Sequence, residues 1–408
     1  MPSAVTAPSS GRNPTAPTSD ALRRTFVVAS ASLVAVFAAS AAPVPVFNVY
    51  RAENGLTTAD LSLSVVAYFA GTIIALLCLG RLAHHLGRRP VGLATLLTMI
   101  AGSLVLLDVT GLGALVAGRF LMGVGAGLAS SALTSYIADS APDRPAWAAG
   151  VVTSQAPMLG LTIGSVISGA LVQYVPGARV WVYVVMAALL ALCLLLMLGC
   201  RETGEPTPGV WRSLRPRVSV PARARSLLPV ALSVFTATWA LGAFYQSFVP
   251  TIARDQLHSD NALVVSLLFA AYMAPSVAGA PLVGRLLPAT AQRLGMVVFV
   301  VGVTGILVAL VTASVVVMTT ATIVASVGQG MGVSASMRAL LLGSTAAERP
   351  SLMAAIYLAC YTGAMVPSII AGQLSHVLPT VTIAFGYGVL ALVATAITLV
   401  FARNPSGA

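Results

Sequence analysis

The chain of 408 residues repeats itself at an offset of about 204 positions, which is half its length. Tyr68 is followed by Gly80-Arg81-Leu82, and 204 positions later Tyr272 is followed by Gly284-Arg285-Leu286. An acid–arginine pair recurs one position out of step, as Asp143-Arg144 and Glu348-Arg349. Each tripeptide closes an apolar run and each pair opens another. Several coincidences in the same order predict two structurally equivalent halves.

The amino-acid composition indicates whether water or lipid surrounds this chain. Hydrophobic residues make up 58% of the sequence and charged residues 8%, whereas a soluble domain carries about 25% charge. A chain this apolar cannot cover its surface with polar groups, so we expect a lipid bilayer around it. The net charge of +11 does not indicate nucleic-acid binding, because the arginines are scattered through short segments between apolar runs.

Apolar stretches long enough to span a bilayer, which takes about 20 residues, predict twelve helices. The first follows Arg23-Arg24 and continues to Tyr50. The others are expected near 60–80, 91–108, 112–138, 146–174, 180–200, 228–252, 261–284, 294–313, 316–343, 351–375 and 380–402. The predicted fold is therefore all-α and polytopic. We expect a disordered tail (1–22), a six-helix bundle (23–200), a basic proline-rich linker (201–227), a second six-helix bundle (228–402) and a short tail (403–408).

The distribution of arginines predicts the orientation, because cytosolic loops are enriched in positive charge. With the amino terminus inside, 17 of the 22 basic residues, all arginines, fall on the cytosolic side. The other side keeps Arg51, Arg179 and Arg254, while Arg119 and Arg338 lie within helices or near their ends. We therefore expect both termini in the cytosol of a cell bounded by this membrane.

The segment that links the second and third predicted helices carries the sharpest motif. Gly80 ends an apolar run, Gly87 turns the chain, and Arg88-Arg89 follow. This pattern resembles the loop signature of the major facilitator superfamily, in which an acid stands four positions after the first glycine. His84 occupies that position here, and His85 stands where an arginine is usual. In the family the acid helps to lock the two halves together on the cytosolic side, so the substitution makes such a lock absent or dependent on protonation.

Two further segments strengthen the resemblance. Arg119, followed by Gly123, Gly125 and Gly127, is similar to the arginine-containing fourth-helix pattern of the family. A cation about 12 Å into a helix is costly unless it faces water or a partner. It either faces a central cavity and serves substrate or proton movement, or reaches outward, toward Asp108, and only sets the topology.

The fifth predicted helix contains Ala156-Pro157 followed by Gly160, which resembles a motif of bacterial drug:proton antiporters in the same superfamily. The alternative interpretation is an ordinary proline kink with close packing of small residues. The four cysteines show no metal-ligand spacing and are expected to be packing residues.

The resemblance implies an alternating-access transporter whose halves are related by a twofold axis along the membrane normal. It also implies which helices line the path, and their polar and aromatic residues are candidates for contact with substrate or protons. These are Asn48, Tyr68, Arg119, Gln155, Trp239, Tyr245, Gln246, Tyr272, Gln329, Tyr357 and Tyr361. Each has an alternative role in packing between helices or at the membrane interface.

A cytosolic gate is expected where the loop motif meets the end of the fourth helix. Its candidate residues are Gly80, His84, Gly87, Arg88, Arg89 and Asp139. We expect Arg88 and Arg89 to pair with Asp139 when the transporter faces outward. Protonation of His84 would add charge there only in mildly acidic conditions; the alternative is a solvated loop histidine.

The acids exclude several mechanisms. All eleven lie in tails, loops or helix ends, so proton coupling would not use a carboxylate at the centre of the membrane. Coupling would then involve Asp60 or Asp108 beside Arg119, a proton carried by the substrate, or no proton at all. The sequence shows no catalytic or phosphate-binding arrangement, and we expect neither an enzyme nor a cofactor.

Three functions remain open. The first is proton-coupled efflux of a small organic molecule, the second is import of a small nutrient or organic anion, and the third is a membrane sensor that transports nothing. We expect a monomer in the cytoplasmic membrane whose partners are a small-molecule substrate, protons and lipid.

Overall fold

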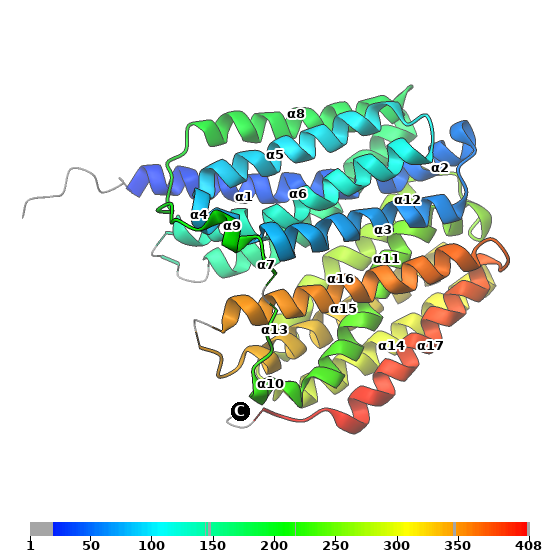
Figure 1. Cartoon of the computed structure of the whole chain (residues 1–408). Coiled ribbons are helices and arrows are strands. Elements are labelled where there is room, and N and C mark those ends of the chain that lie inside the picture. The colour runs from blue at the N-terminus through cyan, green and yellow to red at the C-terminus, as the bar shows by residue number, and fades with distance from the viewer. Residues whose placement is uncertain (1–18, 143, 146–147, 217, 346–347, 406–408) are drawn as a thin grey trace, which may run out of the picture.

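The structure of the protein is a computed structural model that describes residues 19–405 apart from 143, 146–147, 217 and 346–347. The described residues form helices and connecting segments and include no strand (Figure 1). Twelve helical spans among them are long and apolar enough to cross a membrane. This number confirms the prediction, and the predicted boundaries agree with the observed ones to within a few residues.

The first six spans form the N-terminal half. Its elements are α1 (Ser19–Ala41), α2 (Pro43–Asn54), α3 (Thr58–Ile74), η1 (Ala75–Leu79), α4 (Leu82–Leu86), α5 (Arg88–Val105), η2 (Leu106–Asp108), α6 (Leu112–Asp139), α7 (Ala148–Tyr174) and α8 (Ala178–Leu198). A linker follows at the predicted basic, proline-rich segment, and it contains the two short helices α9 (Val210–Ser213) and α10 (Ala222–Arg225).

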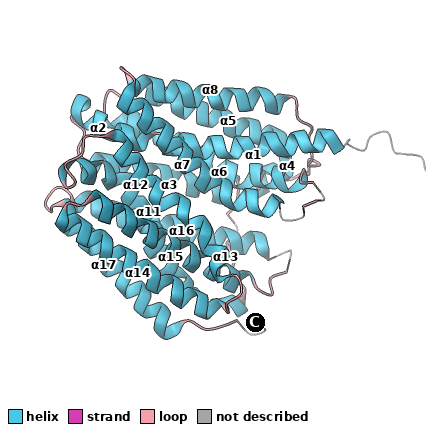
Figure 2. Cartoon of the chain, turned by 180° about the vertical axis from the view of Figure 1, so that it is seen from behind, coloured by secondary structure: helices cyan, strands magenta, loops and turns pink. Residues whose placement is uncertain are grey.

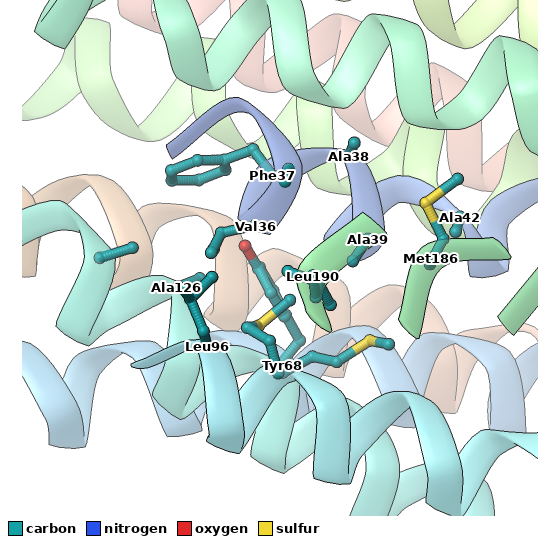
Figure 3. Close-up of a cluster of buried hydrophobic side chains, with 14 of the residues drawn as sticks. Val36, Phe37, Ala38, Ala39, Ala42, Tyr68, Leu96, Ala126, Met186 and Leu190 are labelled. Atoms are coloured by element: carbon teal, nitrogen blue, oxygen red, sulfur yellow. The ribbon is translucent and has the colours of Figure 1, made fainter. Parts of the chain in front are cut away.

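The last six spans form the C-terminal half. Its elements are α11 (Leu228–Asp255), α12 (Ala262–Met273), η3 (Ala274–Ala278), α13 (Gly279–Val283), α14 (Pro288–Thr312), α15 (Val315–Leu341), α16 (Arg349–Leu374) and α17 (Thr380–Phe401). Each half has its own large apolar core. Figure 3 shows part of the first core, where Tyr68 extends from α3 toward α1.

The first span is longer than predicted. Helices α1 and α2 follow one another at Pro43 and together cover Asp20–Asn54. Helix α1 begins at Ser19, so the predicted end of the disordered tail at residue 22 is wrong; residues 1–18 of that tail lie outside the described part. Asp20 lies in the first turn, where the helix dipole favours a carboxylate.

The start of α1 and the end of α17 lie at the same face of the bundle (Figure 1). We call this the terminus-bearing face; it carries the start of α1, the linker and the end of α17. The opposite, far face carries the connections at 55–57 and 256–261. At 55–57 the chain turns through Gly55, whose φ is 65°, and α3 begins with a capping box between Thr57 and Asp60.

The contacts between the halves follow the sequence repeat. Helix α3 packs against α16, and α12 packs against α7. Helices α3 and α12 are the second spans of their halves, while α7 and α16 are the fifth. Exchanging the two halves therefore exchanges these two interfaces, as a pseudo-twofold axis requires. The fold is the predicted one of two pseudo-symmetric six-helix halves.

The two halves are joined at the far face and in the membrane interior. In both views the helices of the two halves lie closest near the far face and diverge toward the terminus-bearing face (Figures 1 and 2). The hydrogen bonds that join the halves within the described residues agree with this arrangement. They lie at the far face or in the membrane interior.

Candidate functional site

Arg119 is the centre of the candidate site. It lies on α6, inside the membrane-spanning region, and its side chain is fully buried. Its guanidinium donates one hydrogen bond of 2.7 Å to the carbonyl oxygen of Ser40 and another of 3.2 Å to Oε1 of Gln246. It also lies over the ring of Tyr68, 4.7 Å from the centroid, a distance at which the cation and the ring attract.

These contacts decide between the two interpretations of Arg119. The alternative in which it reaches outward toward Asp108 is wrong, because Asp108 pairs with Arg179 at 3.2 Å and its side chain is 82% exposed. Of the three coupling alternatives, the one that places Asp60 or Asp108 beside Arg119 has no contact to support it, because Asp60 instead caps α3 through Thr57. Within the described residues Arg119 has only neutral partners.

The position of Arg119 depends on small residues in α6. Gly123 packs against the backbone of Tyr68, and Gly127 packs against Thr72, both on α3. A side chain at either glycine would separate α6 from α3. These glycines therefore bring the guanidinium of Arg119 close to the Tyr68 ring.

An aromatic cluster extends from this point into the C-terminal half. Phe69, next to Tyr68, lies 6.0 Å from the ring of Tyr361 on α16. Tyr361 in turn contacts Trp239 on α11 at 4.9 Å and Tyr357 at 6.4 Å. We call Phe69, Trp239, Tyr357 and Tyr361 the junction aromatics. Trp239 and Tyr357 are only partly buried, so the cluster offers some free aromatic surface.

The remaining predicted path residues of the C-terminal half lie deeper in its core. The fully buried rings of Tyr245 and Tyr272 stack at 4.9 Å, and their hydroxyls bond to Thr322 and to the carbonyl of Thr238. Gln329 is also buried, and its Oε1 has no partner among the described residues. In this state Tyr245 and Tyr272 stabilise the packing of α11, α12 and α15.

Polar contacts close the junction at the far face. Asn48, predicted to line the path, donates instead to the carbonyl oxygen of Pro250 at 2.9 Å. Arg51 pairs with Asp255 at 3.5 Å. Further bonds join the halves from Thr58 to Thr251, from Ser62 to the carbonyl of Ser368, and from the Ala262 amide to Gln173. A cavity of about 760 Å³ lies outside this closure and is lined by Arg51 and Asp255 among others.

The predicted gate at the terminus-bearing face is only partly as expected. Arg88 pairs with Asp139 at 2.9 Å. Arg89 does not pair with Asp139, because its guanidinium donates to the carbonyl oxygen of Leu198. Both partners of the Arg88 pair belong to the N-terminal half, and the pair exists while the far face is closed. The expected link between this pair and the outward-facing state stays a prediction. His84 is exposed, and its ring contacts His85.

Glu202, which no sequence pattern singled out, anchors the linker to α5. Its carboxylate accepts hydrogen bonds from the backbone N–H groups of Arg88 and Arg89 at 2.7 and 2.9 Å, at the start of α5. Gly87 has a φ of 100°, and the carboxylate of Glu202 occupies the space that a side chain there would need. Glu202 stands four residues after α8 ends at Leu198, so its sequence position alone offered little signal.

The two ends of the linker contact different halves. At its beginning Glu202 binds the start of α5, and near its middle Arg81 of the N-terminal half donates to the carbonyl oxygen of Ser213 at 2.7 Å. At its end, Arg223 pairs with Glu348 of the C-terminal half at 3.1 Å. A hydrogen bond from the Thr345 N–H, together with Arg223, holds the pKa of the Glu348 carboxyl below its usual value. The linker thus tethers both halves at the terminus-bearing face.

The proline motif of the fifth span shapes the contact between α7 and α1. Pro157 lies inside α7, and Ala156 is buried. Gly160 packs against Val34 and Phe37, and Gly164 packs against Ala38. Gln155, predicted to line the path, is partly exposed and bonds to its neighbour Ser154. The motif therefore supports close helix packing, and no path contact of Gln155 is found in the described part.

Comparison with known proteins identifies the family. The sequence profile of the Major Facilitator Superfamily matches residues 28–337. The chain belongs to this superfamily. It is a multi-pass membrane protein of a transporter superfamily, and the resemblance carried by the loop and fourth-helix motifs is confirmed.

Two curated relatives are similar to a short part of the chain. The Multidrug resistance protein MdtL of Klebsiella pneumoniae (strain 342) is 29% identical over 92 residues, and that of Citrobacter koseri is 30% identical over 93 residues. The alignments cover 22–23% of this chain and 24% of the length of those relatives. This local similarity agrees with the expected likeness to drug-exporting members.

Among solved structures, a POT family transporter in complex with 5-aminolevulinic acid has a TM-score of 0.71. It is 14% identical in sequence, and the match covers 93% of this chain and 96% of that one. At this level of identity the similarity supports the fold alone.

Proposed function

We propose that this protein exports a small organic molecule across the cytoplasmic membrane by alternating access. The observation that carries the proposal is the contact of Arg119 with Gln246, which joins the two halves in the membrane interior. On the far-face side of this contact, polar bonds close the junction between the halves. On the terminus-bearing side, the halves diverge. Rocking of the halves about this junction would expose the site to each side in turn.

The orientation rests on the arginine distribution. We place both termini, the linker and the loop 81–87 in the cytosol, because cytosolic loops are enriched in arginine. The structure then represents the inward-facing state. Topology reporters fused at Asp20 and at Asn404 test this placement. Both should report the cytosolic side, and signals from opposite sides would contradict the even number of spans.

Export rather than import is favoured by two features. The Ala156-Pro157 and Gly160 motif resembles that of drug:proton antiporters, and part of the chain is similar to multidrug resistance proteins. We further propose that protons drive the export and that the protein acts as a monomer. A specific observation favours import of an organic anion as the second candidate, because Arg119 has only neutral partners among the described residues.

A paired experiment separates the candidates. Cells that lack their own exporters are grown on a panel of toxic compounds with and without the protein, and reconstituted vesicles are tested for solute flux. Export predicts increased resistance together with flux out of the cytosolic side. Uptake of a labelled organic acid without resistance would favour import. Vesicles that carry no solute across the panel would contradict both.

A further inference from the structure

Among the described residues, the membrane interior holds a buried positive charge without a neighbouring acid. Arg119 is fully buried. The described acids all lie at helix ends or in connecting segments, and the nearest candidates, Asp60 and Asp108, have other partners. A buried cation without a counter-ion is expensive in a bilayer. Such a residue is expected to meet an anion during the working cycle.

The partners of Arg119 leave capacity for that anion. A guanidinium has five N–H donors, and only two of its hydrogen bonds are made here, to the Ser40 carbonyl and to Gln246. The Nε of Arg119 is buried without a hydrogen-bond partner. The Tyr68 ring covers one face of the group but accepts no conventional hydrogen bond.

The transport cycle would free a further donor. Ser40 and Tyr68 belong to the same half as Arg119, whereas Gln246 belongs to the other half. When the far face opens, α11 must move away from α6, and Arg119 loses its hydrogen bond to Gln246. It then presents at least two N–H groups to the open side, which is the arrangement that binds a carboxylate with two parallel hydrogen bonds.

The junction aromatics define the other part of the ligand. A continuous series of ring contacts leads from Tyr68, beneath Arg119, through Phe69 and Tyr361 to Trp239. Flat apolar molecules pack well on such surfaces. The series crosses from one half to the other, so a ligand on it would contact both.

Resting on the proposed transport function, we propose that the substrate is an organic anion with a flat aromatic body. Its carboxylate binds the guanidinium of Arg119 in the state with the far face open, and its rings pack on the junction aromatics. The fixed charge of Arg119 balances the charge of the substrate in the membrane interior. In a cell whose interior is negative, the membrane potential favours export of an anion, and this contribution needs no buried carboxylate.

The test uses matched probes on the purified full chain. Benzoate, 1-naphthoate and 9-anthroate are compared with their primary amides and with the corresponding arylmethylammonium ions. Binding is measured by quenching of tryptophan fluorescence and by the shift in thermal unfolding. We expect the tightest carboxylate to bind at least about tenfold more strongly than its amide, as for hydrogen bonds to charged groups.

Variants assign the preference to Arg119. The Arg119→Gln variant should lose the preference for carboxylates, and Arg119→Lys should retain part of it, because lysine keeps the charge but not the fork geometry. If Arg119→Gln fails to fold, Gln246→Ala provides the second variant. It should strengthen carboxylate binding by up to about tenfold, because it destabilises the state in which Gln246 competes for the guanidinium.

The outcomes separate this inference from the proposed function. Equal binding of carboxylates and amides by the wild-type protein would overturn the inference, as would no carboxylate binding or a preference that survives in Arg119→Gln. Flux of neutral or cationic aromatic compounds alone would overturn it while leaving the transport function intact. Absence of flux for every solute in vesicles that carry the wild-type protein would contradict the transport function.

Discussion

Arg51 pairs with Asp255 across the junction of the two halves, and the two residues are 204 positions apart, which is the offset of the sequence repeat. Each lies in the last turns of the first span of its half. Equivalent positions can touch only near the axis that relates them, so this pair marks where the pseudo-twofold axis crosses the far face. Opening of that face must separate the pair.

We predict that removing this pair shifts the protein toward the state with the far face open. Both side chains are partly exposed, so the pair contributes about 0.2–1 kcal/mol, and Arg51→Ala should change the population of the open state by only a few fold. Distances between spin labels at Ala52 and His258 would report the shift. The control is Arg254→Ala, which removes an ion pair with Asp260 inside one half and should leave the distances unchanged. Exchanging the charges of Arg51 and Asp255 should restore the wild-type distribution.

We predict that Glu202→Gln loosens the linker from the start of α5. The carboxylate accepts hydrogen bonds from the Arg88 and Arg89 backbone, where the helix dipole adds about 0.3–1 kcal/mol to the binding of a negative charge. Hydrogen exchange at these two amides should accelerate in the variant. Glu205→Gln, an exposed acid of the same linker, is the control. Equal exchange in both variants would show that Glu202 does not hold the linker.

We predict that Gly164→Ala impairs folding, whereas Gly150→Ala in the same helix does not. A methyl group at Gly164 would meet the backbone of Ala38 on α1, whereas a methyl group at Gly150 would have no atom within 4 Å. Overpacking of this kind costs about 1–3 kcal/mol, while alanine in an open helix position is favourable by about 1 kcal/mol. The melting temperature in detergent should fall only for the first variant. Unchanged melting for Gly164→Ala would mean that α1 and α7 can separate at little cost.

We predict that the double substitution of Asp60 and Asp108 by Asn leaves any proton-driven transport intact. Neither carboxylate contacts Arg119; Asp60 caps α3, and Asp108 pairs with Arg179. Solute flux driven by a pH gradient in reconstituted vesicles, with a pH-sensitive dye to follow protons, measures this. Loss of proton movement with retained binding of substrate would instead make one of these acids part of the coupling path.

The sequence by itself determined the twelve spans, their division into two related halves, and the placement of the acids at helix ends. These features follow from the thickness of the bilayer and the cost of a charge inside it, and both act on single segments. The start of α1 at Ser19 was missed because hydropathy marks the end of the apolar run, and α1 extends beyond it.

Only the tertiary structure decided which polar groups meet. The sequence suggested Asp108 as a partner of Arg119, but packing brought Gln246 and Ser40 to it and gave Asp108 to Arg179. Tertiary packing likewise placed Glu202 at the start of α5. It also closed the far face rather than the terminus-bearing face. Such pairings join residues that are far apart in the chain, and they depend on close glycine packing and the relative position of the halves, which no single segment encodes.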